Sequence, residues 1–145
     1  MKKVSVLLCV FILFVLSKSN ANDSCRILFN KQMIYKGDVE RETAVALLTV
    51  KPFTSKDCIT IKYNSEHANK GWDRTFYING PNEKNLKTIT IGQQSGTVSV
   101  KASALNEMKE KKQPVFIYTT SLPSDKALAA RVRVRRMLIC KIEWN

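Results

Sequence analysis

Histidine, glycine and proline are scarce in this 145-residue sequence, which holds one histidine, five glycines and four prolines. A single histidine excludes a histidine-rich metal site, and the cysteines form no C-x-x-C pair of the kind that structural zinc sites use. The sequence also has no phosphate-binding loop and no dinucleotide fingerprint. We therefore predict neither a metal nor a cofactor.

Recognisable catalytic arrangements are missing as well. His67 is the only imidazole for a nucleophilic triad, and Ser65 and Glu66 adjoin it in sequence rather than face it. Residues 92–96 read G-x-x-S-G, which differs from the G-x-S-x-G spacing of a nucleophile elbow. The 12 acidic residues are scattered, and none lies in an apolar run that would keep it protonated for glycoside hydrolysis. We predict that the protein is not an enzyme, and a small secreted hydrolase is the catalytic alternative.

Residues 1–21 have the organisation of a secretory signal peptide. Two lysines precede an apolar run over residues 4–16, and small residues stand at positions 19 and 21. Such a run forms a helix about 20 Å long, whereas the hydrocarbon core of a bilayer is about 30 Å thick. We therefore expect cleavage, no transmembrane anchor, and a single domain over residues 22–145 in the periplasm or outside the cell.

Basic residues outnumber acidic ones, with 24 lysines and arginines against 12 aspartates and glutamates. After removal of Lys2, Lys3 and Lys18, the net charge of the mature chain is still +9. This charge attracts acidic partners. Because exported proteins seldom meet nucleic acid, we expect an acidic protein face or an acidic envelope polymer as partner, and no nucleic acid.

Three cysteines remain in the mature chain, Cys25, Cys58 and Cys140. In an oxidising compartment, this odd number predicts one disulfide and one unpaired thiol. Strand alternation places Cys25 and Cys140 on inward faces and Cys58 on an outward face. The alternation ranks Cys25–Cys140 first, Cys25–Cys58 second and Cys58–Cys140 third. Three reduced thiols packed as small apolar side chains are the alternative.

Short apolar or alternating segments separated by turn residues indicate a mainly β domain. The spacing of residues 86–91 and 97–101 predicts a hairpin, and short helices are expected over 103–112 and 124–130. The expected architecture is a two-sheet antiparallel β-sandwich of immunoglobulin-like layout, and a flattened β-barrel is the alternative. The other strands are expected at 25–29, 32–35, 44–50, 59–63, 73–78, 115–120 and 131–144.

The last of these strands carries the densest charge. Residues 131–135 read R-V-R-V-R, so a strand would place Arg131, Arg133 and Arg135 on one face, about 6.6 Å apart. Arg136 breaks the alternation, and a bulge beside it would restore the inward phase. Guanidinium groups at this spacing suit carboxylates, sulfates or phosphates. The alternative is a charged edge strand that prevents unwanted pairing.

A second candidate surface is the loop over residues 69–74, which places Trp72 close to Arg74. Tryptophan and arginine are enriched at interface hot spots. The alternative is that Trp72 closes one end of the sandwich.

These features together favour an exported binding protein. We expect an inhibitor or immunity partner of an envelope- or cell-wall-acting protein, an inference from size, charge and the missing catalytic groups. The alternative is a subunit or accessory factor of a surface or secretion assembly, which needs an open sheet edge or a donor strand.

Signal-peptide cleavage can be tested directly. We predict that the mature chain begins at Asn22, or within about two residues of it, because signal peptidase prefers small side chains at positions 19 and 21. Intact-mass analysis of protein from the native host measures this end. An exported chain that still carries Met1 would contradict the prediction.

Overall fold

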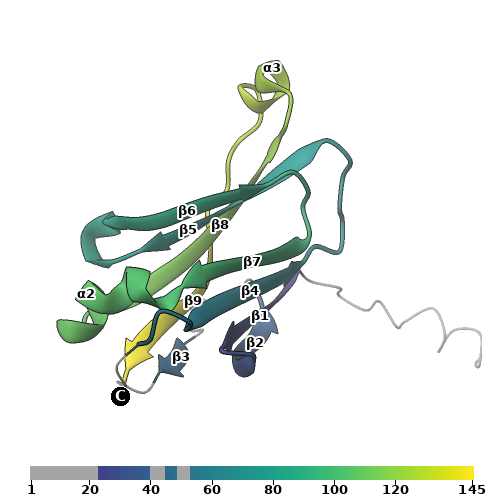
Figure 1. Cartoon of the computed structure of the whole chain (residues 1–145). Helices are drawn as coiled ribbons and strands as arrows, with labels where there is room; N and C mark the ends of the chain where they lie inside the picture. Colours follow the sequence, from purple (N-terminus) through teal and green to yellow (C-terminus); the bar gives the residue numbers. More distant parts are fainter. Residues whose placement is uncertain (1–22, 40–44, 49–52) are drawn as a thin grey trace, which may run out of the picture.

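Two β-sheets pack face to face in a β-sandwich (Figure 1). The computed structural model describes residues 23–39, 45–48 and 53–145. One sheet has four strands in the order β2-β1-β4-β7, and the other has five in the order β3-β9-β8-β5-β6. Neither sheet closes on itself, so the predicted sandwich is confirmed and the barrel alternative is wrong.

Neighbouring strands are antiparallel, except that β3 and β9 run parallel. The expected strand over residues 44–50 is found as β3, and its remaining positions lie outside the described residues. The four-stranded sheet contains β1 (Ser24–Phe29), β2 (Gln32–Asp38), β4 (Cys58–Asn64) and β7 (Gly96–Lys101). The five-stranded sheet contains β3 (Val45–Leu48), β5 (Trp72–Asn79), β6 (Asn85–Ile91), β8 (Val115–Pro123) and β9 (Met137–Trp144).

Alternate side chains of the central strands build the core between the sheets. In β4, Ile59, Ile61 and Tyr63 are buried, and Lys62, which lies between the last two, is exposed. A strand with one buried face shows this period of two. Burial of each large aliphatic side chain contributes about 1.5–3 kcal/mol. The other fully buried side chains of the core include Ile27, Phe76, Val115, Ile117, Ile139 and Ile142.

Strand β2 is longer than expected. The sequence predicts a turn over residues 36–38, but these residues continue the strand because each has a partner in β1. Lys36 lies opposite Arg26, and Asp38 lies opposite Ser24. Hydrogen bonding to β1 therefore outweighs the local turn preference of the Lys-Gly-Asp sequence.

The predicted hairpin of residues 86–91 and 97–101 is wrong. These residues form β6 and β7, which belong to different sheets: β6 pairs with β5, and β7 pairs with β4. Each strand has apolar side chains on one face. Because the chain crosses from one sheet to the other, the apolar faces of the two strands pack against a common core. A Cβ atom at Gly96, where β7 begins, would lie 2.7 Å from Cδ1 of Ile91, so a larger residue there would require that side chain to shift.

Of the expected strand over residues 131–144, the first six residues do not form a strand. Strand β9 begins at Met137, opposite Thr119. The part of β8 that follows Thr119 pairs with β5 and not with β9. The alternating arginines and valines lie in an irregular segment instead. The bulge lies at Ile139 rather than beside Arg136, because the pairing of β8 with β9 passes from Cys140 to Leu138. Both Ile139 and Cys140 are consequently buried.

Two short helical elements match the expected positions. The 3₁₀ turn η2 (Ala102–Leu105) follows Lys101 and leads into the single-turn helix α2 (Asn106–Glu110). Helix α3 (Lys126–Ala129) is capped by Asp125, whose side chain accepts a hydrogen bond from the backbone N–H of Leu128 at 2.8 Å. No helix in the described parts of the chain is long and apolar enough to cross a membrane.

Candidate functional site

Arg74, one of the predicted binding residues, is buried between the sheets, with 2% of its surface exposed. Its Nε donates to the backbone oxygen of Gln94 at 2.6 Å, and its Nη1 donates to Oγ1 of Thr119 at 3.2 Å. The guanidinium carbon lies 3.8 Å from the ring centroid of Tyr63. Arg74 therefore joins segments of the fold, and its predicted binding role stays a prediction that this burial does not favour.

Asp23 supplies the opposite charge for this buried arginine. Its Oδ2 lies 3.7 Å from Nη2 of Arg74 and accepts a hydrogen bond from Oη of Tyr63 at 2.6 Å. Burial, followed by this hydrogen bond, raises the pKa of Tyr63, and burial lowers the pKa of Arg74. Oδ1 of Asp23 accepts from Oγ of Ser65 and from the backbone N–H of Glu66. The cluster fastens the start of β1 to the end of β4.

Trp72 and Arg74 have different surroundings, although only two positions separate them in sequence. It is half-buried opposite Pro123, at the end of the sandwich. A cavity of about 350 Å³ adjoins it, lined by residues 68–72 and 92–95, of which Lys70 is the one charged residue. Trp72 therefore borders this cavity, whereas Arg74 is buried between the sheets.

Arg131, Arg133 and Arg135 are exposed, as predicted. They do not lie on a strand, so they lack the regular spacing that the proposed contact with anionic groups assumed. The segment that holds them links α3 to β9. The next residue, Arg136, has a different role: its guanidinium lies 4.0 Å from the ring centroid of Tyr118, and its Nη1 pairs with Oε1 of Glu83 at 3.1 Å. Arg136 thus fastens the segment to the outer face of the five-stranded sheet.

Strand register brings together three other cations that sequence reasoning missed. Arg26 in β1 lies directly opposite Lys36 in β2 on one side and directly opposite Lys62 in β4 on the other. All three side chains are exposed on the outer face of the four-stranded sheet. We call Lys36, Arg26 and Lys62 the basic row. Arg26 and Lys62 alternate with buried neighbours in their own strands, and Lys36 alternates with half-buried ones, but no local signal reveals that the three are aligned.

The basic row is electrostatically unfavourable for the folded chain alone. Like charges directly opposite each other on neighbouring strands destabilise a sheet, by tenths of a kcal/mol to about 1 kcal/mol per pair. None of the ion pairs found among the described residues includes a member of the basic row. The carboxylate that follows along β2 is Asp38, two residues from Lys36 and opposite Ser24. The arrangement leaves three cations directed at solvent.

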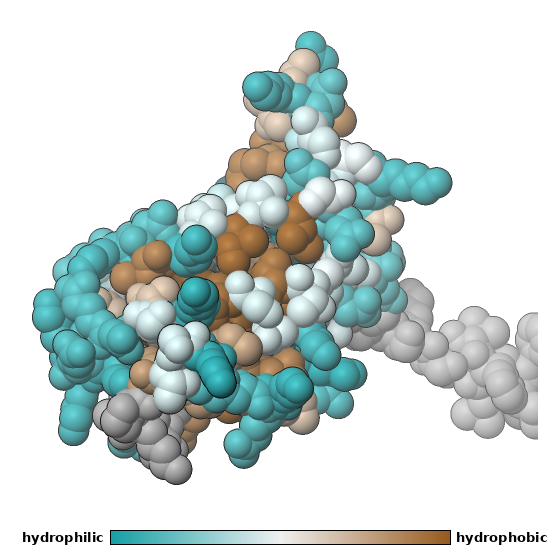
Figure 2. Space-filling view, viewed as in Figure 1, coloured by the Kyte–Doolittle hydropathy of each residue, from teal (hydrophilic) through white to brown (hydrophobic). Residues whose placement is uncertain are grey.

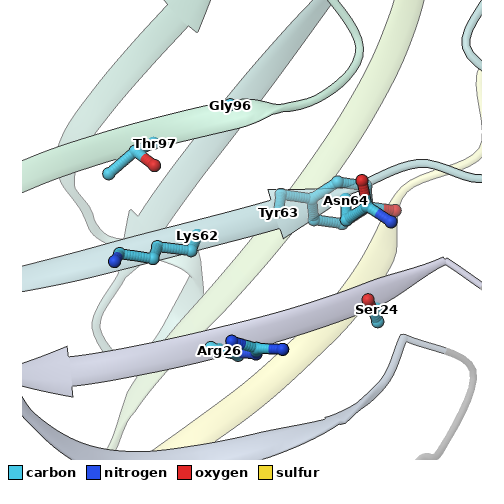
Figure 3. Close-up of a pocket in the computed structure, with 7 residues that line it drawn as sticks. All are labelled: Ser24, Arg26, Lys62, Tyr63, Asn64, Gly96 and Thr97. Carbon is cyan, nitrogen blue, oxygen red and sulfur yellow. The ribbon is translucent and has the colours of Figure 1, made fainter.

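A shallow depression of about 280 Å³ lies against the basic row (Figure 3). Arg26 and Lys62 meet there on neighbouring strands, beside the hydroxyl groups of Ser24 and Thr97 and the amide of Asn64. Two cations with neutral hydrogen-bond donors form a surface that suits carboxylate, sulfate or phosphate groups. The residues that line the depression are Ser24, Arg26, Lys62, Tyr63, Asn64, Gly96 and Thr97.

The three described cysteines are present as thiols, so the predicted disulfide is not formed in the structure. Cys25 and Cys140 are buried in the core, where they pack as small apolar side chains, and Cys58 is half-buried. Burial raises the pKa of the Cys25 thiol to about 12. Burial also raises the pKa of Cys140, and the neighbouring Cys25 raises it further.

No known protein family matches the sequence, and no curated protein is similar to it. Within the residues that the structure describes, no three His, Cys, Asp or Glu side chains gather closely enough to bind a metal ion.

Thiol accessibility provides a test of the cysteine arrangement. We expect iodoacetamide at neutral pH to modify Cys58 alone in the folded protein, because Cys25 and Cys140 are buried and protonated. In denaturant without reductant, all three should react, as peptide mass mapping would show. If Cys25 and Cys140 resist modification until a reductant is added, the two are joined by a disulfide.

Proposed function

We propose that this protein is an exported, non-enzymatic binding protein that holds an acidic partner on its basic row. The partner is an acidic protein face or an acidic envelope polymer, and the role we infer is inhibition of, or immunity against, an envelope- or cell-wall-acting protein. The observation that supports this proposal is the direct opposition of Lys36, Arg26 and Lys62 across three strands.

The repulsion within the basic row favours the binding of an anionic partner. A partner that carries anionic groups converts the repulsion between the three cations into attraction, so the complex gains more than an isolated surface lysine could provide. Neighbouring strands are about 4.8 Å apart, so the row spans about 10 Å of a nearly flat surface. Such a surface fits several carboxylates of a protein face, or successive acidic groups of a polymer, better than one small molecule.

Removal of the row should weaken binding and leave the fold intact. We expect the double variant Arg26→Gln/Lys62→Gln to bind an acidic polymer such as heparin at least about tenfold more weakly at low salt, because two charge-assisted contacts are lost. Its melting temperature should equal or exceed that of the unmodified chain, since the repulsion between neighbouring strands is relieved. Calorimetric titration and thermal unfolding measure the two effects.

A matched control separates the row from net charge. Lys87→Gln/Lys112→Gln removes the same charge at two exposed positions elsewhere. We expect the control to retain most of the affinity. Equal losses in both double variants would show that only overall charge matters, which would contradict the proposed site. Pull-down from the native envelope with both variants, followed by mass identification, applies the same comparison to the natural partner.

A second candidate function is that of a subunit in a surface or secretion assembly. It is favoured by the edges of the two sheets, since β6 and β7 are the outermost strands on the same side of the sandwich (Figure 1). Apolar side chains are visible between the two sheets on this side (Figure 2). Ile89 of β6, which is half-buried, packs against the core there. A strand from another subunit could pair with either edge and cover these side chains.

The open edge can be tested by a charge placed on one face or the other of β6. If an assembly partner inserts between β6 and β7, Ile89→Lys should abolish crosslinking to that partner in the native envelope, because a lysine there disturbs the apolar surface. Thr88→Lys adds the same charge to the outer face of the strand and should leave crosslinking unchanged. Identical crosslinking in the two folded variants would contradict this function.

A further inference from the structure

One part of the chain projects from the sandwich. After β8 ends at Pro123, the chain forms α3 at the tip of this projection and returns through residues 130–136 to β9 (Figure 1). The base of the projection is held firmly, because the backbone N–H of Ser124 donates to the oxygen of Gly71 at 2.8 Å and its Oγ donates to Oδ1 of Asp73 at 2.6 Å. We call residues 124–136 the tip segment.

Apolar side chains are exposed on the tip segment. Leu128 of α3 and Val134 of the returning chain each have 48% of their surface exposed. Large apolar side chains with this exposure are few in the described parts of the chain, and the others lie on β2 and β3. Two of these side chains lie on this one short projection, and neither belongs to the core.

Cations surround the two apolar side chains. Lys126, Arg131 and Arg133 are exposed on the same segment. Its one acidic residue, Asp125, caps α3 through its side chain. Apolar and hydrophilic residues are mixed on the surface of the projection (Figure 2). The tip segment therefore combines exposed aliphatic groups with positive charge.

We propose that the tip segment docks on the surface of an anionic lipid bilayer. Leu128 and Val134 enter the boundary between headgroups and acyl chains, and Lys126, Arg131 and Arg133 contact anionic headgroups. Peripheral proteins bind membranes by this combination, in which apolar insertion and attraction to anionic lipid reinforce each other. The contact is reversible, since neither contribution alone anchors a protein firmly.

The shape of the tip favours a lipid surface over a protein partner. A stable protein interface buries about 800 Å² on each side around a central pocket or aromatic anchor. The tip segment has two separate exposed aliphatic side chains and no aromatic residue, so it supplies no such anchor. Insertion into a bilayer surface requires only a narrow projection that reaches about 5–10 Å into the headgroup region.

The tip segment and the basic row are separate surfaces. The row lies on the outer face of the four-stranded sheet, whereas the tip segment connects two strands of the other sheet. Membrane docking therefore does not depend on the proposed function. Variants of one surface serve as controls for the other.

Vesicle flotation tests this inference. The mature chain is mixed with vesicles of phosphatidylcholine alone, or of phosphatidylcholine with phosphatidylglycerol, and the bound fraction is measured at low and high salt. We expect binding to the anionic vesicles only, and weaker binding at high salt. Leu128→Ser/Val134→Ser should lower the partition coefficient about tenfold at either salt concentration, because apolar insertion is lost. Arg131→Gln/Arg133→Gln should lower it by a similar factor at low salt only.

Two controls make the result specific. Val45→Ser/Leu47→Ser removes apolar side chains of comparable exposure, 45% and 55%, from β3 and should not change vesicle binding. Arg26→Gln/Lys62→Gln should not change it beyond the effect of net charge. Each variant is first checked for an unchanged melting temperature.

Three outcomes would overturn the inference. The first is failure of the unmodified chain to bind anionic vesicles. The second is equal binding by the Leu128/Val134 variant and the Val45/Leu47 variant. The third is loss of an envelope protein partner from the tip variants while vesicle binding is absent, which would assign the tip segment to a protein. None of these outcomes alters the heparin comparison that tests the basic row.

Discussion

A buried arginine constrains how the two sheets fit together. Burial of an unpaired guanidinium would cost several kcal/mol, so partners must reach Arg74 inside the sandwich. They come from the start of β1 through Asp23, from β4 through Tyr63, from the β6–β7 connection through Gln94, and from β8 through Thr119. Satisfying this one side chain therefore requires both sheets and the crossing between them to be in place.

The same constraint explains why the functional surfaces lie outside the core. Apolar side chains and the Arg74 cluster occupy the space between the sheets, and the depression at the basic row lies on an outer face. Outer faces contribute little to folding, so charge can accumulate there at a modest cost. The alignment of Lys36, Arg26 and Lys62 follows from the register of β1 with its two neighbours, which the buried side chains of the same strands determine.

The two basic surfaces that we infer differ in their physical character. The basic row is rigid and nearly flat, because it lies on three hydrogen-bonded strands. The tip segment is narrow and carries exposed aliphatic groups beside its cations. Under our proposals, the tip segment brings the protein to an anionic membrane and leaves the basic row available for an acidic partner.

Local patterns in the sequence were enough to predict the sandwich, because alternation with a period of two and turn residues act within single strands such as β4 and β5. They were not enough for pairing: β6 and β7 are close in sequence yet lie in different sheets, and the arginine-valine repeat has no strand neighbour. The burial of Arg74 and the alignment of Arg26 with Lys62 depend on contacts between residues far apart in sequence. Only the tertiary structure decides such contacts, because they follow from the burial of a shared core and not from any local preference.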